Sequence, residues 1–287
     1  MVSIVICTNK GVDDVISVLR QVVCSAKQSN LEFEVILVIN TKIVFDSIPS
    51  DYYRNISGKI KVLIEPKRGK SSALNCGIAS AQFPYLLFTD DDCYVPIDWV
   101  SSYSSFFNAK NAVITGTVIL DSKLRKSWME DFHLACLAQV PSAGLEDNIV
   151  GANWAVRKDI LDQVGSFDEC LGPGTFCGLG EDTHVATKLF DLVGRFTVNT
   201  SSPVIHKPDI SRLKRKQWLR HVSKISRSLF YIRHGKEPEY GPITVTTIIL
   251  YAKYLVISLL EKFRTLGSPI TARELTAYQR FYYQYLN

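Results

Sequence analysis

The sequence lacks the cysteine arrangement of a zinc knuckle or of a disulfide-stabilised domain. It contains seven cysteines, an odd number, and no two of them form a C-x-x-C pair. An odd count argues against a complete disulfide framework, so reduced and mostly buried thiols are expected. The chain also lacks internal repeats and low-complexity tracts, and 46% hydrophobic with 21% charged residues excludes a disordered protein.

A strong net charge and a long apolar run are missing as well. The formal net charge is +5, which gives no reason to expect a nucleic-acid partner. The longest apolar stretch, residues 243–260, has 18 residues and contains Lys253, whereas a spanning helix needs about 20 apolar residues. We expect this stretch to lie on a bilayer, or to pack on the domain or on a partner subunit in a homo-oligomer. The amino-terminal MVSIVICTNKG is apolar too briefly for a signal peptide, so we expect a cytoplasmic protein.

What the sequence does contain is a series of short apolar runs separated by helical or loop segments. A β-branched run at 3–7 is followed by apolar residues at helical spacing over 12–23. The later runs are residues 33–39, 60–64, 85–88, 112–120 and 150–157. Continuous apolar strands with intervening helices indicate a mostly parallel sheet covered on both faces. A glycine-rich loop at 171–180 and a predicted helix beginning at Glu181 follow.

Ligands bind at the carboxyl ends of the strands in such sheets, so the polar residues after each run are candidate site residues. Three consecutive aspartates, Asp90, Asp91 and Asp92, follow the run at 85–88. Like charges at close range raise each other's pKa unless a cation lies among them. Carboxylate oxygens suit Mg²⁺ or Mn²⁺, which in turn bridge phosphate oxygens. A solvated acidic loop is the alternative, but the position at a strand end favours a metal site.

Three other segments carry candidate chemistry. The basic loop 65–70 precedes a predicted helix whose amino end would favour an anion such as a diphosphate, although it also fits a solvated loop. Glu181 and Asp182 open a helix, either as an acid that meets a second substrate or as ordinary helix capping. His206 follows a predicted strand, either as a third metal ligand or as a polar residue without special function.

Taken in order, these segments resemble the family 2 glycosyltransferases of GT-A fold over about residues 1–235. The motifs that carry the resemblance are SIVICTNK, EVILVIN, KRGKSSALNCGIASAQFPYLLFTDDD, GANWAVRKDILDQVGSFDECLG, GLGEDTHVATKL and VIH. Each motif alone is weak, but their order and approximate spacing are specific. The resemblance implies an α/β fold with a mixed, mostly parallel central sheet flanked by helices. It also implies a nucleotide-diphosphate sugar as donor, Mn²⁺ or Mg²⁺, and inversion at the anomeric carbon.

The resemblance assigns roles to the acidic residues. Asp90 and Asp92 would form the family's D-x-D motif, with Asp92 as metal ligand and Asp90 holding the ribose or the metal shell. Asp91 matches the variable position and would share either duty. Asp182 would be the general base that takes the proton of the acceptor hydroxyl, and Glu181 would help to orient the acceptor.

Other positions follow from the same resemblance. Thr8 would lie beside the nucleotide, and Arg68 and Lys70 would line the base and phosphates. Asn153 would face the donor sugar, and His206 would complete the metal site.

The sequence departs from the family after the second strand. Many members carry two aspartates there, the second of which accepts a hydrogen bond from uracil, whereas this chain has Ile39 and Asn40. Asn40 can accept through its carbonyl oxygen but also donates through its amide. We therefore take a UDP-sugar only as the default donor.

The last 80 residues have a different composition. Residues 207–227 contain eight cations and a single acid, Asp209. They fit contact with the donor diphosphate, attraction to an anionic membrane or a solvated helix face. The membrane is favoured because each basic residue near an anionic leaflet contributes about 1 kcal/mol. We predict a GT-A domain over residues 1–235 and a helical segment over 236–287, with peripheral membrane contact through residues 207–260.

The sequence thus predicts an inverting, metal-dependent glycosyltransferase with a saccharide or lipid-linked acceptor, acting in polysaccharide or glycolipid synthesis at the inner face of the membrane. A nucleotidyltransferase is the alternative enzyme, but its amino-terminal glycine-rich phosphate loop is absent and Glu181-Asp182 would have no task. A non-catalytic sugar-nucleotide or membrane-binding module of the same fold is the alternative from another class. The presence of Asp90, Asp92 and Asp182 together argues against it.

Overall fold

The computed structural model describes residues 1–287 except 11, 42–58, 109, 138–143, 238–244, 265–269 and 287. An eight-stranded sheet forms the centre, in the order β3-β2-β1-β4-β7-β6-β8-β5. The strands are β1 (Val2–Thr8), β2 (Phe33–Ile39), β3 (Ile60–Ile64), β4 (Tyr85–Asp90), β5 (Cys93–Tyr94), β6 (Val113–Leu120), β7 (Trp154–Arg157) and β8 (Thr197–His206). The helices are α1 (Val12–Gln28), α3 (Lys70–Ser80), α4 (Trp99–Ser104), α5 (Asp131–Cys136), α6 (Lys158–Val164), α7 (Glu181–Val193), α8 (Arg215–His234), α9 (Val245–Arg264) and α10 (Ala272–Tyr285), with a 3-10 turn η2 (Ile210–Leu213).

The sheet is mixed and mostly parallel, as the sequence predicts. Strands β3, β2, β1 and β4 run parallel, and β6 is parallel to β8. Strand β7 runs antiparallel between β4 and β6, and β5 pairs antiparallel with β8. The predicted strand at 150–157 is shorter than expected, because residues 150–153 precede it outside the strand and only Trp154–Arg157 pair.

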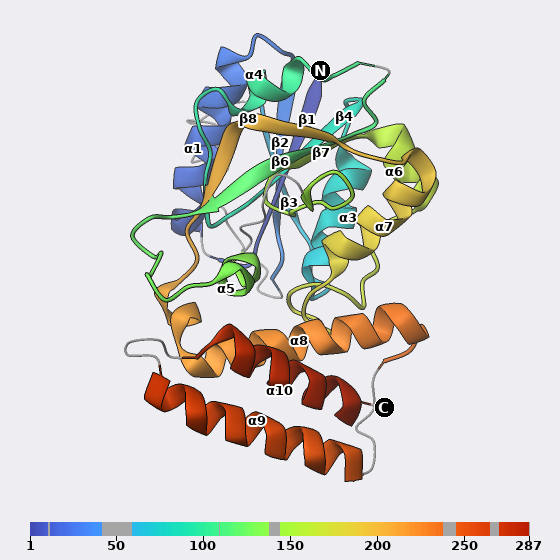
Figure 1. The fold of residues 1–287 in the computed structure, drawn as a ribbon. Coiled ribbons are helices and arrows are strands. Elements are labelled where there is room, and N and C mark those ends of the chain that lie inside the picture. The colour runs from blue at the N-terminus through green and yellow to red at the C-terminus, as the bar shows by residue number, and fades with distance from the viewer. Residues whose placement is uncertain are drawn as a thin grey trace.

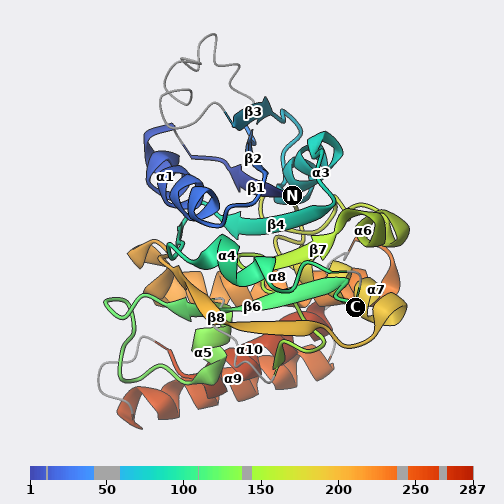
Figure 2. The same cartoon turned by 90° about the horizontal axis from the view of Figure 1, so that it is seen from above.

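Helices cover both faces of the sheet because the parallel strands are apolar on both. Successive residues of β1 point to opposite faces: Ile4 packs with α1 and α4, and Val5 packs with α3, α6 and α7. The two views show α1 on one side of the sheet and α3, α6 and α7 on the other (Figures 1 and 2). This arrangement leaves the carboxyl ends of β1, β2 and β4 free of the helices that cover the faces.

A third layer of helices lies across those strand ends. The amino terminus is at the far end of the sheet, so the parallel strands run toward α8, with α10 beside it and α9 outermost (Figure 1). A separate apolar core joins α8 to α10 and α5, and it includes Trp218, Val222 and Leu275. Helix α8 ends at His234, followed by Gly235 in the left-handed conformation (φ 65°). Among the described residues, no helix is long and apolar enough to cross a membrane.

Candidate active site

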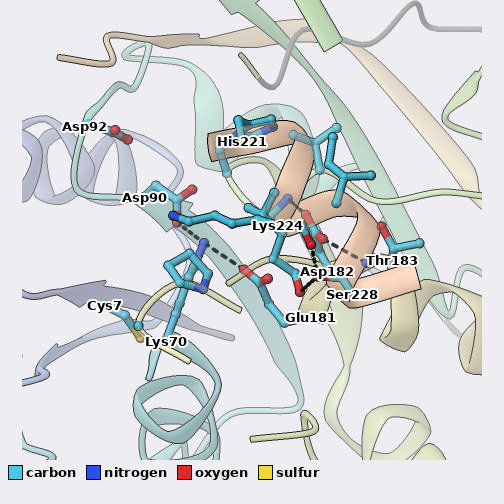
Figure 3. A pocket seen from close by; sticks show the side chains of 18 of the residues that line it. Cys7, Lys70, Asp90, Asp92, Glu181, Asp182, Thr183, His221, Lys224 and Ser228 are labelled. Atoms are coloured by element: carbon cyan, nitrogen blue, oxygen red, sulfur yellow. Dashed lines mark hydrogen bonds and ion pairs between the residues drawn. The ribbon is translucent and has the colours of Figure 1, made fainter. Parts of the chain in front are cut away.

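A cleft of about 1170 Å³ lies between the strand ends and α8 (Figure 3). Its walls come from β1 and β4, from the loops before α3 and α7, and from the inner face of α8. The sequence-predicted residues that line it are Thr8, Asn40, Arg68, Lys70, Asp90, Asp91, Asp92, Glu181, Asp182 and His206. Residues that are far apart in the chain therefore meet at one edge of the sheet.

The three aspartates have three different partners. Asp90 is the last residue of β4 and forms an ion pair with Lys70 at 2.6 Å. Asp91 accepts a hydrogen bond from the Thr8 hydroxyl at 2.5 Å and pairs with Lys10 at 2.9 Å. These contacts tie the acidic turn to the end of β1 and supply cations that offset the repulsion among the carboxylates. Burial nevertheless raises the pKa of Asp91 above its ordinary value.

Asp92 faces His206 at the end of β8. The His206 Nδ1 is 2.7 Å from the Leu137 carbonyl oxygen, which can only accept, so Nδ1 carries a proton. Nε2 then faces Asp92 Oδ2 at 3.3 Å. Burial alone would raise the pKa of Asp92, but the hydrogen bond to His206 and the charges of His206, Lys10 and Arg212 hold it well below its usual range.

This pair fits a divalent metal ion. When His206 is neutral, the Nε2 lone pair points at a carboxylate, which is unfavourable unless a proton or a cation lies between them. A carboxylate oxygen and an imidazole nitrogen are both ligands of Mn²⁺. The described residues contain no group of three or more His, Cys, Asp or Glu side chains arranged for a metal, and Asp90 instead pairs with Lys70. A metal held by Asp92 and His206 would therefore take further ligands from water or from a bound phosphate.

Lys70 connects the acidic turn to the start of α7. Its ammonium lies 2.6 Å from Asp90 and 3.8 Å from Glu181 (Figure 3). Burial would lower the pKa of Lys70, but the carboxylates of Asp90 and Glu181 raise it well above its ordinary value, so the side chain stays charged. Burial and the neighbouring Asp182 raise the pKa of Glu181 to about 7. Glu181 is thus buried within the site, next to Lys70.

Asp182 is the acid that opens onto the cleft. It lies in the first turn of α7, partly exposed, and its Oδ2 accepts a hydrogen bond from the Gly151 backbone amide at 3.3 Å. Its other oxygen accepts from the Thr183 amide at 2.8 Å. Two contacts to neutral backbone groups fix the carboxylate in place, which suits a group that must accept a proton.

Two loops pack against each other beneath these residues. The Lys70 amide donates to the Pro173 carbonyl at 2.9 Å, and the Ser71 hydroxyl donates to the Leu171 carbonyl at 2.7 Å. Gly174 lies so close to Gly69 that a Cβ on Gly174 would be 3.2 Å from the Gly69 Cα. The glycines of the 171–180 loop therefore allow it to contact the basic loop and place Glu181 beside Lys70.

Asn40 braces the basic loop. Its amide nitrogen donates to the carbonyls of Glu65 at 2.9 Å and Lys67 at 2.7 Å, and its Oδ1 accepts from the Gly69 amide at 3.0 Å. The side chain borders the cleft, but its donors and its acceptor are engaged within the protein. The structure thus adds a bracing function that the sequence did not suggest.

Asn153 is where the structure contradicts the sequence-based assignment. Its side chain is fully buried, with Oδ1 accepting from Trp99 Nε1 and the Tyr103 hydroxyl, both at 2.8 Å, and Nδ2 donating to the Thr117 carbonyl at 2.8 Å. It therefore holds α4 to the sheet and does not reach the cleft. Gly151, just before it, is the residue of this segment that contacts the site, through Asp182.

Contact with the donor diphosphate was one of three sequence-based interpretations of residues 207–227, and the structure places the inner face of α8 at the cleft. His221, Lys224 and Ser228 line the cleft (Figure 3). Arg212 of η2 also lines it. Burial and the charges of Arg212 and Lys224 lower the pKa of His221 to about 3, so its ring is neutral. The spacing of positions 221, 224, 225, 228 and 232 marks one helix face, and this periodicity was the available signal.

A comparison with protein families gives the deciding match. Residues 3–165, more than half of the chain, match the family model of glycosyl transferase family 2. The chain belongs to glycosyl transferase family 2. The predicted family is thereby confirmed, and the protein is a glycosyltransferase by family. A search of the curated proteins finds no match.

Solved structures share the fold of this family 2 glycosyltransferase at low sequence identity. The mannosyltransferase PcManGT from Pyrobaculum calidifontis, determined in complex with GDP-Man and Mn²⁺, is 16% identical, with a TM-score of 0.61, 96% of this chain and 85% of that chain covered. S. aureus TarS, residues 1–349, is 15% identical, with a TM-score of 0.55, 99% of this chain and 90% of that chain covered. These likenesses confirm the predicted GT-A fold.

Proposed function

We propose that this family 2 enzyme is an inverting, divalent-metal-dependent glycosyltransferase that moves a sugar from a nucleotide-diphosphate sugar to an acceptor hydroxyl. The observation that carries the proposal is the placement of Asp182 and of the Asp92–His206 pair in one cleft, with Lys70 between them. One end of the cleft thus offers a proton acceptor, and the other offers groups that stabilise a departing diphosphate.

Asp182 would act as the general base. The two backbone hydrogen bonds hold its carboxylate at the mouth of the cleft, where an acceptor hydroxyl can approach above a bound donor. Removing that proton as the hydroxyl attacks the anomeric carbon gives direct displacement, and therefore inversion. Alignment of two substrates in one cleft contributes about 7 to 11 kcal/mol through effective molarity.

The opposite end would stabilise the leaving group. Asp92 and His206 would hold the metal ion, which when bound neutralises charge on the nucleotide diphosphate. Lys70 and Arg68 add positive charge from the basic loop, as does Lys224 from α8. The mannosyltransferase PcManGT with GDP-Man and Mn²⁺ supports a nucleotide-sugar donor and a divalent metal.

The donor base is proposed as uracil by default. Both amide hydrogens and the carbonyl oxygen of Asn40 are engaged in hydrogen bonds to residues 65–69. Other groups that line this part of the cleft would therefore recognise the base. Thr8 borders the same region but already donates to Asp91.

The acceptor is proposed to be a saccharide or a lipid-linked saccharide, in polysaccharide or glycolipid synthesis. We place the enzyme in the cytoplasm, at the inner face of the membrane, with peripheral contact through its carboxyl-terminal segment. The basic composition of residues 207–227 supports this location. We also propose residues 1–235 as the catalytic domain and 236–287 as a helical segment, with the membrane contact made through residues 207–260.

An Asp182→Asn variant tests the base assignment. We expect the wild type with Mn²⁺ and pooled saccharide and lipid acceptors to release the nucleotide diphosphate from one nucleotide sugar. The variant should lose this turnover by about 10²- to 10⁴-fold, while its metal-dependent affinity for the nucleotide changes less than about twofold, since the base acts on the acceptor. Asp191→Asn, an exposed carboxylate on the same helix, is the matched control. Loss of nucleotide binding in a folded Asp182→Asn variant would overturn the assignment.

A further inference from the structure

Helix α9 is attached to the protein through polar side chains and through ring contacts of its tyrosines Tyr251 and Tyr254 with α10. Thr247, Tyr254 and Glu261, spaced seven residues apart, are buried at 2%, 7% and 7% exposure. Arg215 of α8 donates to the Tyr254 hydroxyl at 3.2 Å and to Ser258 Oγ at 2.9 Å. Glu261 also pairs with Arg273 of α10 at 3.6 Å. The face of α9 that packs on the protein is therefore rich in hydrogen-bonding groups.

The opposite face of α9 is apolar and open. Its large apolar side chains are between 48% and 58% exposed along about three turns of the helix. We call them the α9 stripe: Ile248, Ile249, Leu255, Val256, Leu259 and Leu260. Among the α9 side chains that the structure describes, Lys253 is the only exposed charged one. Figure 1 shows α9 as the outermost element, with α8 and α10 between it and the sheet.

This polarity is the reverse of that of a helix on a water-facing surface, which buries its apolar face and exposes its charges. Single exposed leucines are common. A contiguous row of six large aliphatic side chains on one helix is instead typical of a surface that is covered in use. The polar contacts of Arg215 and Arg273 hold α9 in this orientation, so the exposure follows from the packing.

The charge of the helices around α9 indicates which partner covers the α9 stripe. Residues 207–287 contain fifteen lysines and arginines against five acidic residues. Two of those five acids, Glu261 and Glu274, are buried against arginines. Such a layer attracts an anionic lipid surface, whereas two copies of it placed face to face would repel each other. No described helix is suited to cross a bilayer, so α9 would lie in its plane.

We propose that the α9 stripe inserts into the interfacial region of an anionic lipid bilayer and seats the protein on the membrane. This assignment rests on the proposed function for the peripheral location and specifies the surface that makes the contact. Exposed cations of the carboxyl-terminal layer, among them Lys253 on α9, would pair with the lipid headgroups, and α9 would lie parallel to the bilayer. The cleft, with α8 as one wall, would then be separated from the lipid by α8 and α9, on the side of the protein that faces a membrane-anchored acceptor.

The test is flotation of the full chain with vesicles. One vesicle type contains phosphatidylcholine alone, and the other contains phosphatidylcholine and phosphatidylglycerol in equal parts. We expect binding to the anionic vesicles that weakens with added salt. The triple variant Ile248→Gln, Val256→Gln, Leu259→Gln should lose at least tenfold in vesicle affinity. These side chains are 57%, 57% and 58% exposed, so polar replacements leave the core intact.

A matched triple variant controls for the loss of apolar surface in general. Ile97→Gln, Ile119→Gln, Leu192→Gln replaces three exposed apolar residues outside α9, at 52%, 40% and 46% exposure, and should bind vesicles like the wild type. Equal binding by the α9 variant, no binding by the wild type, or equal affinity for uncharged vesicles would each overturn the proposal. A wild-type dimer in solution that becomes monomeric in the α9 variant would also overturn it, because a second copy would then cover the stripe.

Nucleotide binding separates this proposal from the proposed function. The α9 variant should keep the metal-dependent thermal stabilisation by nucleotide of the wild type, since no stripe residue lines the cleft. Lost vesicle binding by the wild type with an intact nucleotide response overturns the membrane contact alone. Intact vesicle binding without any nucleotide response overturns the transferase assignment alone.

Discussion

At the scale of single residues, three neighbouring aspartates differ in what they can do because they have different partners. Asp90 pairs with Lys70, and Asp91 pairs with Thr8 and Lys10. Asp92 has an imidazole nitrogen as its neighbour, which is itself a metal ligand. Of the three carboxylates, Asp92 is therefore the one that we propose as a metal ligand.

Replacing Asp92 should remove the metal response. Asp92→Ala takes away the carboxylate that faces His206 Nε2, so we expect the nucleotide affinity of the variant to be the same with and without Mn²⁺. Titration calorimetry at matched ionic strength measures both affinities. The surface variant Asp191→Ala should retain the wild-type metal response. A wild-type dependence of nucleotide affinity on Mn²⁺ in Asp92→Ala would show that the metal has other ligands.

Glu181 gives a pH dependence of stability. Its pKa of about 7 lies above the ordinary value of 4.5, so the folded state holds its proton more tightly than the unfolded chain. Its contribution is present below about pH 4.5 and is lost as the pH rises through 7, by about 3 kcal/mol. Urea unfolding at pH 5 and pH 8 should show this loss in the wild type but not in Glu181→Gln. Equal changes with pH in both proteins would contradict the assignment.

The sequence singles out these acidic residues as site candidates because the signal lies in the segments next to them. Asp90 directly follows an apolar run, and Glu181 and Asp182 directly follow a glycine-rich loop. Asn153 was misassigned because its partners, Trp99 and Tyr103, are about 50 residues away in the chain. A hydrogen-bond network of that range leaves no pattern in the sequence around the residue.

At the scale of elements, α8 and the 171–180 loop form one wall of the site. Gly178 has φ +83°, and a Cβ there would lie 2.8 Å from Lys224 Cγ. The Ser228 hydroxyl donates to the Leu179 carbonyl at 2.7 Å. The loop thus lies flat on α8 and fixes the stem of Lys224 where it enters the cleft.

A Gly178→Ala variant tests this contact. A left-handed residue with a side chain costs about 1 to 2 kcal/mol, and we expect a further cost of about 1 to 3 kcal/mol because Lys224 must leave its place. Gly235→Ala is the matched control, since Gly235 is left-handed with φ +65° and a Cβ added there would meet nothing within 4 Å, so only the backbone cost applies. Urea unfolding measures both changes in free energy.

The double variant with Lys224→Ala isolates the clash. In that background Gly178→Ala should cost no more than Gly235→Ala, because the obstructing methylenes are gone. An undiminished cost would mean that the loop and α8 are not coupled through Lys224.

Element types follow closely from the sequence, whereas their lengths and their contacts do not. The runs at 33–39 and 60–64 form β2 and β3 with the predicted bounds because they are mostly apolar, each with a single charged residue, Glu34 or Lys61. The predicted run at 150–157 forms a strand only in its second half, β7. Residues 150–153 turn instead and place the Gly151 amide beside Asp182. The cleft-facing side of α8 was hidden because cations occupy several of its faces at once.

At the scale of the whole molecule, the excess of positive charge lies in one layer of helices. Residues 1–206 carry 18 basic and 23 acidic residues, whereas residues 207–287 carry 15 and 5. The positive part forms the layer of α8, α9 and α10 below the strand ends (Figure 1). Because α8 belongs both to the cleft and to the core with Leu275, this layer is structurally continuous with the site.

The central claim is that the cleft binds a nucleotide diphosphate through a divalent metal. The most direct test is the melting temperature of the full chain with UDP, GDP, dTDP or CMP, each with and without Mn²⁺. A ligand at 100 times its dissociation constant adds about 2.7 kcal/mol to the stability of the folded state. We expect stabilisation by one nucleotide diphosphate, and only when Mn²⁺ is present. No stabilisation of the folded protein by any nucleotide, with or without metal, would contradict it.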